Sequence, residues 1–343
     1  MKKLLNTLYV TTPMSYLSLE GETVVVKNED GRAMQVPLLN VENIICFGSI
    51  GASPAVMGAC AAQNIGLIFL TRSGRFLARI TGKVNGNVLL RKKQYLLSDR
   101  QDDCVRLGRW FLTGKIYNAR KVIDRGIRDH AAIIDVQALT RVSTALLENL
   151  KTMHSCTNEN DLMGCEGNAA RGYFSVLDEL ILQQKECFYI KERSRRPPLD
   201  NFNALLSFFY TILTHEIASA LESVGLDPCV GFLHKDKPGR PSLALDIIEE
   251  LRPVLVDRFV LSMVNLKQVS GNGFIQKESG GVVMDDETRR KVITLWQKRK
   301  NDEIIHPFLK EHVKFGLIPY IQALLLARYL RGDMDAYPPF FWS

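Results

Sequence analysis

The chain has 343 residues, of which 46% are hydrophobic and 24% are charged. This balance is typical of a globular protein long enough for two domains, and it excludes a disordered chain, a fibrous protein and a single small module. The formal net charge is +7, with basic clusters at residues 91–93, 191–196 and 289–300. Clustered positive charge favours nucleic acid as a partner, although lysine-rich helix faces that are only solvated would produce the same count.

The cysteines and the apolar runs indicate the compartment. The chain has 7 scattered cysteines and no C-x-x-C pair, so neither a zinc knuckle nor a disulfide framework is indicated. Asn6 and Thr7 interrupt the apolar run after the first lysines, and no stretch approaches the roughly 20 apolar residues of a membrane span. We therefore expect reduced thiols, a cytoplasmic location and no membrane segment.

Residues 1–85 carry the pattern of a mainly-β domain. Alternation over residues 16–19, a turn at Gly21 and β-branched residues up to Val26 predict a hairpin. One helix should run from Pro54 to Ala62 with Ser53 as its N-cap. Further short strands are expected at residues 35–39, 43–47, 67–70 and 76–80.

The pattern changes after this region. Glycine and asparagine at residues 82–87 are typical of a turn or linker, and we place a linker at residues 86–100. From residue 101 to 343 the hydrophobic periodicity is helical, most clearly between residues 202 and 217. Asp200 is placed to cap the N-terminus of that helix. Residues 153–160 and 270–281 should be exposed loops. The predicted fold class is α+β, a small N-terminal mainly-β domain followed by a larger all-α C-terminal domain.

A first candidate site residue is Glu166, in the run GCEGNAARGYF at residues 164–174. On a helix, Glu166 shares a face with Ala169, Ala170 and Tyr173, which are expected to be buried. A buried carboxylate requires a metal, an arginine or a histidine as its partner. The alternative is a capping or first-turn glutamate, whose negative charge would be stabilised by the positive N-terminal end of the helix dipole.

A second candidate region is the helix that follows His234. Its apolar residues fall on one side, and its carboxylates gather on the other: Asp246, Glu249, Glu250 and Asp257. A polar face made only of carboxylates is unusual in a basic protein and would suit a divalent cation. The loop between His234 and the helix could fold the imidazole back over the helix start, giving ligands suited to Mn²⁺ or Mg²⁺. A lone histidine at the surface or in the core is the alternative.

A third region, KERSRRPPLDNF, contains Arg193, Arg195 and Arg196 ahead of two prolines. Arginines in a stiff segment can contact phosphates in pairs of hydrogen bonds, and Arg240 in the loop after His234 is a further candidate. Such contacts position a nucleic-acid backbone without reading its sequence. An exposed basic turn that only aids solubility is the alternative.

Taken together, these runs resemble the CRISPR-associated adaptation integrase family, whose members are metal-dependent DNA endonucleases and integrases that insert new spacers. The resemblance covers nearly the whole chain. It depends on the β-rich N-terminal region and on four ordered motifs: E-G-x-A-A-R-x-Y-F from Glu166, R-R-P-P-x-D-x-x-N-A-L-L-S-F from Arg195, G-F-L-H from Gly231 and S-L-A-L-D-x-x-E-E-x-R-P from Ser242.

The resemblance implies a catalytic C-terminal domain in which Glu166, His234 and Glu249 hold one Mg²⁺ or Mn²⁺. Asp246 matches a further acidic position, a support or occasional ligand, and Glu250 could exchange roles with Glu249. The metal would polarise a phosphodiester that a 3′-hydroxyl of the incoming fragment attacks, and water in its place would give nuclease activity. Because His234 must be neutral to bind a metal, activity should fall in mild acid.

The resemblance also implies partners: double-stranded DNA, a homodimer formed through the β domains, and a small ferredoxin-like adaptation protein. The aromatic, proline-containing C-terminal tail at residues 337–342 is expected to dock on a partner or on its own domain.

Two other functions remain open from the sequence. A non-enzymatic DNA-binding scaffold would gain nothing from keeping Glu166, His234 and Glu249 together without partners. A general DNA-repair or RNA nuclease would use the same chemistry on a different substrate, and only a comparison of substrates separates it from the spacer integrase.

Overall fold

The computed structural model describes residues 7–31, 33–72, 74–80, 82 and 88–342, so the turn predicted at residues 82–87 lies, except for Gly82, outside the described residues. The chain forms two compact units. The N-terminal unit comprises Met1–Gly86, Met284–Ile304 and His312–Ile318, and the helical unit comprises Asn87–Val283, Ile305–Glu311 and Pro319–Ser343. The first boundary lies within one residue of the expected 85, but the residues of the expected linker from Asn87 onward belong to the helical unit, and two later segments belong to the N-terminal unit.

The N-terminal unit contains two four-stranded sheets, in the orders β1-β5-β7-β8 and β4-β3-β2-β6. Strands β1, β5 and β7 are parallel, and β8 is antiparallel to β7. The core between them includes Leu17, Val24, Ile44 and Leu67. The strands are β1 (Thr7–Val10), β2 (Tyr16–Glu20), β3 (Thr23–Lys27), β4 (Ala33–Pro37), β5 (Asn43–Phe47), β6 (Gly51–Ala52), β7 (Gly66–Leu70) and β8 (Phe76–Ile80).

The local signals in this unit were accurate. The predicted hairpin is β2-β3, and the helix α1 (Pro54–Ala62) begins behind Ser53, whose hydroxyl accepts a hydrogen bond from the Val56 amide. The strand expected at residues 35–39 is displaced, because β4 ends at Pro37 and a 3₁₀ turn follows. Proline has no amide to donate to a sheet ladder, so it terminates the strand.

Helix α9 (Asp286–Lys300) belongs to the N-terminal unit. Arg289 donates to the Arg72 carbonyl at 2.7 Å, Gln297 donates to the Thr7 carbonyl at 2.7 Å, and Lys300 reaches the Thr7 hydroxyl. Arg289 and Lys300 are buried. The basic run at residues 289–300 is therefore not an open cationic surface throughout, because its first and last cations hold this helix in place.

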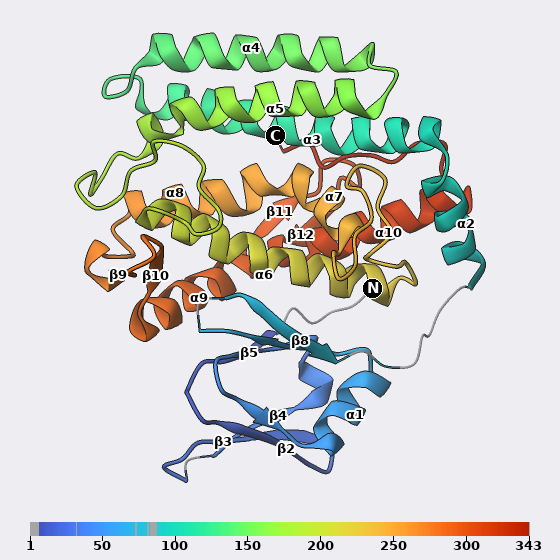
Figure 1. The fold of residues 1–343 in the computed structure, drawn as a ribbon, viewed down its shortest axis with the longest axis vertical. Coiled ribbons are helices and arrows are strands. Elements are labelled where there is room, and N and C mark those ends of the chain that lie inside the picture. Colours follow the sequence, from blue (N-terminus) through green and yellow to red (C-terminus); the bar gives the residue numbers. More distant parts are fainter. Residues whose placement is uncertain (1–6, 32, 73, 81, 83–87, 343) are drawn as a thin grey trace. The chain divides into compact units, whose positions relative to one another are not determined.

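The helical unit is built around α3 (Gln101–His130), which packs against α4, α5 and α7 (Figure 1). Its buried residues include Phe111, Leu112 and Ile123. The other helices are α2 (Val88–Ser98), α4 (Val136–His154), α5 (Glu159–Val176), α6 (Asn201–Ser223), α7 (Ser242–Leu251), α8 (Arg258–Asn265) and α10 (Ile318–Arg331), with a π-helical turn, η3 (Arg252–Asp257), between α7 and α8.

The predicted fold class, a small mainly-β region followed by a larger mainly helical one, is confirmed. Two details differ. Residues 88–98 of the expected linker form helix α2, whose Gln94 donates to two carbonyls of the helical unit and buries its amide. The later region is not all-α, because it contains the short strands β9 (Phe274–Gln276), β10 (Val282–Met284), β11 (Glu303–Ile305) and β12 (His312–Lys314).

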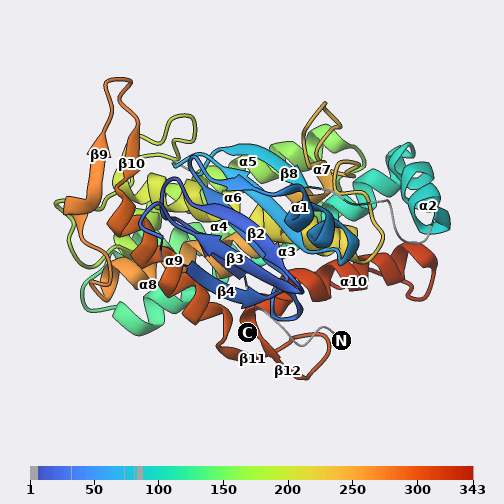
Figure 2. The same cartoon turned by 90° about the horizontal axis from the view of Figure 1, so that it is seen from below.

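Strands β9 and β10 form a hairpin within the segment expected to be a loop, and Figure 2 shows it projecting from the end of the helical unit. The other expected loop is shorter than predicted, because α4 continues to His154 and α5 begins at Glu159.

Helix α6 is long and apolar enough to cross a membrane by length and composition alone. It is instead a core helix of this unit, since 67% of its most apolar window is buried in the protein. Asp200 caps its start as predicted, accepting a hydrogen bond from the Asn203 amide at 2.6 Å. Phe209 packs edge-on against Phe259 of α8.

The C-terminal tail docks on its own unit. The Phe340 amide and the Tyr337 hydroxyl both donate to the Glu250 carboxylate. Asn118 of α3 donates to the Phe340 carbonyl at 2.7 Å and accepts from the Trp342 amide at 2.9 Å. Of the two docking sites expected from the sequence, the structure shows the one on the tail's own domain.

Deleting residues 336–343 should lower the free energy of unfolding by at least about 3 kcal/mol, because Glu250 loses two donors and buried aromatic rings are removed. Urea denaturation followed by circular dichroism measures this loss. Tyr337→Phe should cost about 1–3 kcal/mol by removing one donor alone, and Tyr189→Phe at an exposed ring is the matched control. Unchanged stability on deletion would show that the tail does not hold the unit together.

Candidate active site

The loop before α7 is folded around one buried carboxylate. Asp246 accepts hydrogen bonds from the backbone amides of Phe232, Leu233 and His234 at 2.6, 3.0 and 2.9 Å. The Nδ1 atom of the His234 ring lies 2.8 Å from the same carboxylate. Because a carboxylate only accepts, neutral His234 carries its proton on Nδ1 and presents Nε2 with a free lone pair. The expected folding of the histidine over the helix start is present.

Gly231 permits this close approach. A Cβ atom at this position would lie 2.9 Å from the Asp246 Oδ2 atom and 2.9 Å from the His234 carbonyl oxygen. Both contacts are shorter than side chains tolerate, so a larger residue would push the loop away from α7. The glycine of the G-F-L-H motif therefore has a steric role in placing the imidazole.

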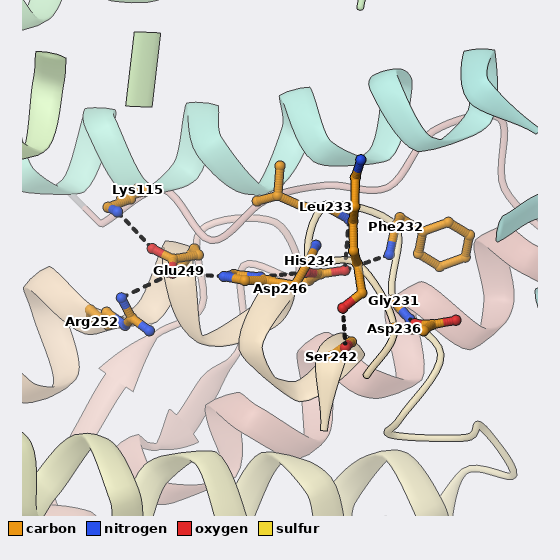
Figure 3. A network of polar contacts seen from close by, with 11 residues as sticks. Lys115, Gly231, Phe232, Leu233, His234, Asp236, Ser242, Asp246, Glu249 and Arg252 are labelled. Atoms are coloured by element: carbon orange, nitrogen blue, oxygen red, sulfur yellow. Dashed lines mark hydrogen bonds and ion pairs between the residues drawn. The ribbon is translucent and has the colours of Figure 1, made fainter. Parts of the chain in front are cut away.

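Glu166 and Glu249 meet at the ammonium group of Lys115. Lys115 Nζ forms ion pairs with Glu166 Oε1 and, at 2.7 Å, with Glu249 Oε2. The three side chains come from α5, α7 and α3, and Figure 3 shows Lys115 reaching Glu249 from the helix above it. The Nε2 atom of His234 lies 3.9 Å from Glu249 Oε1. The structure thus brings Glu166, Glu249 and His234 together around a lysine that the sequence analysis did not identify.

Arg252 supplies a second cation to Glu249, with Nη1 at 2.9 Å from Oε1. Burial by itself would raise the pKa of Glu249, but Arg252, Lys115 and His234 together lower that pKa to about 2. Arg252 also lies over the ring of Tyr210 at 5.0 Å. Glu249 is therefore ionised at every pH at which the protein is expected to work.

Glu250 points away from this cluster. Its carboxylate is fully buried and accepts from Gln322 at 2.9 Å, from the Phe340 amide at 2.9 Å and from the Tyr337 hydroxyl. Burial raises its pKa to about 7, against the effect of these three donors. A Cβ on Gly114 would lie 2.7 Å from Glu250 Cβ, so α3 approaches α7 closely here. Within the glutamate doublet, Glu249 faces Glu166 and Glu250 faces the C-terminal tail.

The interpretation of α7 as a helix with an acidic face is corrected by burial. Asp246, Glu249, Glu250 and Asp257 are exposed by only 0%, 4%, 0% and 1%. They do not form one continuous face, because each carboxylate meets partners from a different element. The π-helical turn at η3 contributes to this, since Pro253 has no amide to continue the α-helical hydrogen bonds.

The interpretation of Glu166 as a first-turn glutamate is wrong. Helix α5 begins at Glu159, where the Asn158 side chain accepts from the Asp161 amide, so Glu166 lies in the middle of the helix. Ala169 and Tyr173 on the same face are buried, as the spacing predicted.

The chemical types of Glu166, Glu249 and His234 suit a hard divalent cation. Two carboxylates and one imidazole nitrogen are ligands used for Mn²⁺ and, with waters, for Mg²⁺. Among the described residues, no three acidic, histidine or cysteine side chains converge closely enough to hold a metal as they stand. The Lys115 ammonium provides the positive charge between the two glutamates.

A pocket of about 480 Å³, including its open mouth, adjoins this cluster. Its wall combines aliphatic side chains, such as Leu146 and Ala169, with cations, aromatic rings and one buried acid, Asp257, which accepts from the Tyr210 hydroxyl at 2.5 Å. Burial raises the pKa of Asp257 to about 6, against the hydrogen bond from Tyr210. The polar lining residues are Lys115, Arg193, Arg195, Arg252, Tyr173, Tyr210 and Asp257. Such a lining suits an anionic ligand with a flat ring.

The four arginines proposed to contact phosphate lie in different environments. Arg193 donates to Asn203 at 2.7 Å and to Ser207 at 3.1 Å, and it packs over Tyr210, so its guanidinium holds the 191–200 segment on α6. Arg195 and Arg196 are exposed, and Arg195 lines the pocket. Arg240 is half-buried in the loop before α7.

Sequence reasoning missed Lys115 and Arg252. A signal for Lys115 was present, because Phe111, Leu112 and Ala119 occupy the same face of α3 and are all buried. A single lysine within an apolar stripe of a helix indicates a buried cation that needs an acidic partner. Arg252 lies three residues after Glu249, where an ion pair is expected on a helix.

Glu250→Gln should reveal the titration of this buried acid. The folded pKa of about 7 lies above the 4.5 of an ordinary glutamate, so the folded state binds the proton more tightly. The resulting stabilisation is present below pH 4.5 and is lost as the pH rises through 7, by about 3 kcal/mol in total. Urea denaturation at pH 4 to 8 should therefore show the wild type losing stability relative to the variant. Parallel pH profiles would contradict the assignment.

Comparison with known proteins gives consistent matches. A family model described as CRISPR associated protein Cas1 matches residues 8–298. A relative from Chlorobaculum tepidum, named CRISPR-associated endonuclease Cas1 1, is 48% identical over 342 residues, and the match covers 100% of each chain.

Solved structures share the fold. A casposase bound to an integration product superposes with a TM-score of 0.83 at 20% identity, over 96% of this chain and 92% of that one. A chain of a Cas6-RT-Cas1–Cas2 complex superposes with a TM-score of 0.82 at 23% identity, over 100% of this chain and 36% of that one. At these identities the likeness establishes the architecture of the chain and nothing more specific.

Proposed function

The chain belongs to the CRISPR-associated Cas1 family, and from this premise we propose that it inserts foreign DNA fragments as new spacers into a CRISPR array, using one divalent metal. The expectation of an endonuclease is confirmed at the level of the family, since the full-length relative carries that name. The name also disfavours the alternative of a scaffold without enzymatic activity. Mg²⁺ or Mn²⁺ is the proposed cofactor.

One observation supports the proposed site more than any other. Glu166 and Glu249, from different helices, direct their carboxylates at a single cation position, and His234 is held beside them. We propose these three residues as the metal ligands, in preference to Glu250, whose carboxylate is occupied by the tail. When bound, the divalent cation would polarise the scissile phosphate and stabilise the leaving oxygen.

The surrounding residues position and balance this site. Asp246 holds the His234 ring in the tautomer whose Nε2 can bind a metal, so we assign it a positioning role in place of a direct ligand role. Arg252 fixes Glu249 and offsets part of its negative charge. The ring of Tyr210 lies beneath Arg252 and limits the directions its guanidinium can take.

DNA is the proposed substrate, with its backbone along the arginine-lined pocket. Arg195 and Arg196 are exposed ahead of α6, and Arg195 reaches the pocket that adjoins the ligands. We propose that they contact phosphates while the 3′-hydroxyl of the incoming fragment attacks the target phosphodiester in line. Arg240 is a further candidate for such a contact, and Arg193 is proposed chiefly to hold the segment in place.

The proposed partners follow from the family. The related chain in the Cas6-RT-Cas1–Cas2 complex assembles with Cas2, and we propose a similar small partner, expected to be ferredoxin-like, for this chain. We also propose a homodimer formed through the β-rich unit and a role in antiviral defence in the cytoplasm.

Strand transfer tests the function directly. A short duplex with free 3′-hydroxyls should join a supercoiled plasmid carrying a repeat when Mn²⁺ or Mg²⁺ and the small partner are added. Glu166→Gln and His234→Ala should each reduce joining by at least about 100-fold, because each removes one proposed ligand. Asp246→Asn should reduce it by about 10- to 100-fold through the orientation of His234.

Matched controls are Glu148→Gln and His154→Ala, which change exposed residues of α4 and should leave joining unchanged. Branched DNA, linear duplex and RNA offered as substrates separate a spacer integrase from a repair or RNA nuclease. Binding of DNA without cutting or joining under all these conditions would favour the scaffold interpretation.

The arginines should separate into two classes. Arg195→Ala should weaken DNA binding and lower the slope of log affinity against log salt by about 1, with the melting temperature unchanged. Arg193→Ala should lower the melting temperature, because it leaves Asn203 and Ser207 without their donor. Fluorescence anisotropy at several salt concentrations and thermal unfolding measure the two effects. Equal behaviour of the two variants would refute this division.

A further inference from the structure

Lys115 occupies the central position of the proposed metal site. It extends from the middle of α3, its side chain is only 13% exposed, and its ammonium contacts one oxygen of Glu166 and one of Glu249. Arg252, the other cation near the cluster, contacts Glu249 through the opposite oxygen. Among the residues that the structure describes, Lys115 is thus the cation that forms ion pairs with both glutamates.

The charge balance explains why a cation is needed there. Glu166 and Glu249 are largely buried carboxylates that face each other, and without a positive charge between them they would repel at low local dielectric. Lys115 and Arg252 together neutralise the two glutamates. This arrangement is complete without a metal, so the helices α3, α5 and α7 can pack together before any metal binds.

The same arrangement excludes a metal while Lys115 stays in place. A divalent ion held by the Glu166 and Glu249 carboxylates would have to occupy the position of the ammonium, which now ion-pairs with both. Mg²⁺ takes carboxylate oxygens at about 2.0–2.1 Å, which leaves no room for the ammonium between them. The ion and the ammonium would then be like charges in contact, which is strongly unfavourable at a buried site. Lys115 and the metal therefore compete for one position.

The pocket provides a place for the displaced ammonium. Lys115 is one of the lining residues of the pocket, together with Arg195 and Tyr210. A lysine carries its charge on a flexible four-carbon stem and can move the ammonium without a backbone shift. Turning toward the pocket would place it among the groups proposed to meet the DNA phosphates.

We infer that Lys115 is a built-in substitute for the metal, which holds Glu166 and Glu249 together in the metal-free protein and is displaced into the pocket when the divalent cation binds. This inference depends on the proposed function, because it takes Glu166 and Glu249 to be metal ligands. It adds that the site exchanges one cation for another and that metal affinity is set partly by a lysine outside the ligand set.

The first test measures binding of Mn²⁺ alone, with no DNA and no activity assay. Free Mn²⁺ is followed by its electron paramagnetic resonance signal in the wild type, Lys115→Met, Lys121→Met and Glu166→Gln. Lys115→Met should bind Mn²⁺ about tenfold more tightly than the wild type, because the competing cation is gone. Lys121→Met is the matched control, since Lys121 lies on the same helix and contacts the ring of Tyr117.

Thermal unfolding of the same proteins distinguishes competition from a purely structural role. Lys115→Met should melt at a lower temperature without metal and show a larger increase on adding Mn²⁺ than the wild type. A structural lysine would lower the melting temperature and leave Mn²⁺ affinity unchanged or weaker, which would overturn the inference. If the wild type and Glu166→Gln bind Mn²⁺ equally, the ligand assignment fails, and the inference about Lys115 fails with it.

A second measurement uses the unmutated protein and so avoids any folding defect. Brief acetylation with an N-hydroxysuccinimide ester, followed by peptide mass spectrometry, reports the accessibility of each lysine. Lys115 should react several-fold faster with saturating Mg²⁺ than without it, whereas Lys121 should not change. His234→Ala should abolish the increase at Lys115. Equal reactivity of wild-type Lys115 with and without Mg²⁺, in protein that binds Mg²⁺, would refute its displacement.

Discussion

A carboxylate can be buried in a protein only where hydrogen-bond donors or a cation meet it, and this constraint organises the helical unit around α7. Four buried acids on α7 and the π-helical turn meet four different sets of partners. Asp246 accepts hydrogen bonds from the preceding loop, and Glu249 forms ion pairs with Lys115 and Arg252. Glu250 accepts hydrogen bonds from the C-terminal tail, and Asp257 accepts one from Tyr210 of α6. Each pairing joins segments that are distant in the sequence.

These pairings also separate the carboxylates that hold the structure together from the carboxylate that we propose as a metal ligand. Asp246 and Glu250 have their oxygens taken up by donors from the protein, so they hold the loop and the tail. Glu249 is satisfied by charge instead, and its pKa of about 2 keeps it ionised. A carboxylate neutralised by a lysine side chain could exchange that lysine for another cation, whereas one fixed by backbone amides could not. This difference is the reason why we propose the metal at Glu249 and not at Asp246 or Glu250.

Local sequence signals predicted much of this protein. Ser53 and Asp200 were recognised as helix caps, and the hairpin β2-β3 followed from alternation around Gly21. Glu166, His234 and Glu249 were proposed as a set from the resemblance to the family, and the structure brings them together. What local signals could not give was the return of α9 to the N-terminal unit, which depends on contacts between Arg289 and Arg72, far apart in the chain.

The sequence by itself determined the order of the β-rich and helical regions, because periodicity and helix caps are local properties. It also contained the motifs on which the family resemblance depends, and through that resemblance the candidate acidic and histidine residues. Only the tertiary structure decided which carboxylate of the 249–250 doublet faces Glu166, that Lys115 stands between the two, and that Arg193 is used on α6. Helical periodicity predicts only which face of a helix carries a side chain. Glu249 and Glu250 are neighbours on α7, yet the first contacts Lys115 and Arg252 and the second contacts the C-terminal tail. The packing of α3 and α5 against α7 resolves that difference, and packing is a property of the whole chain.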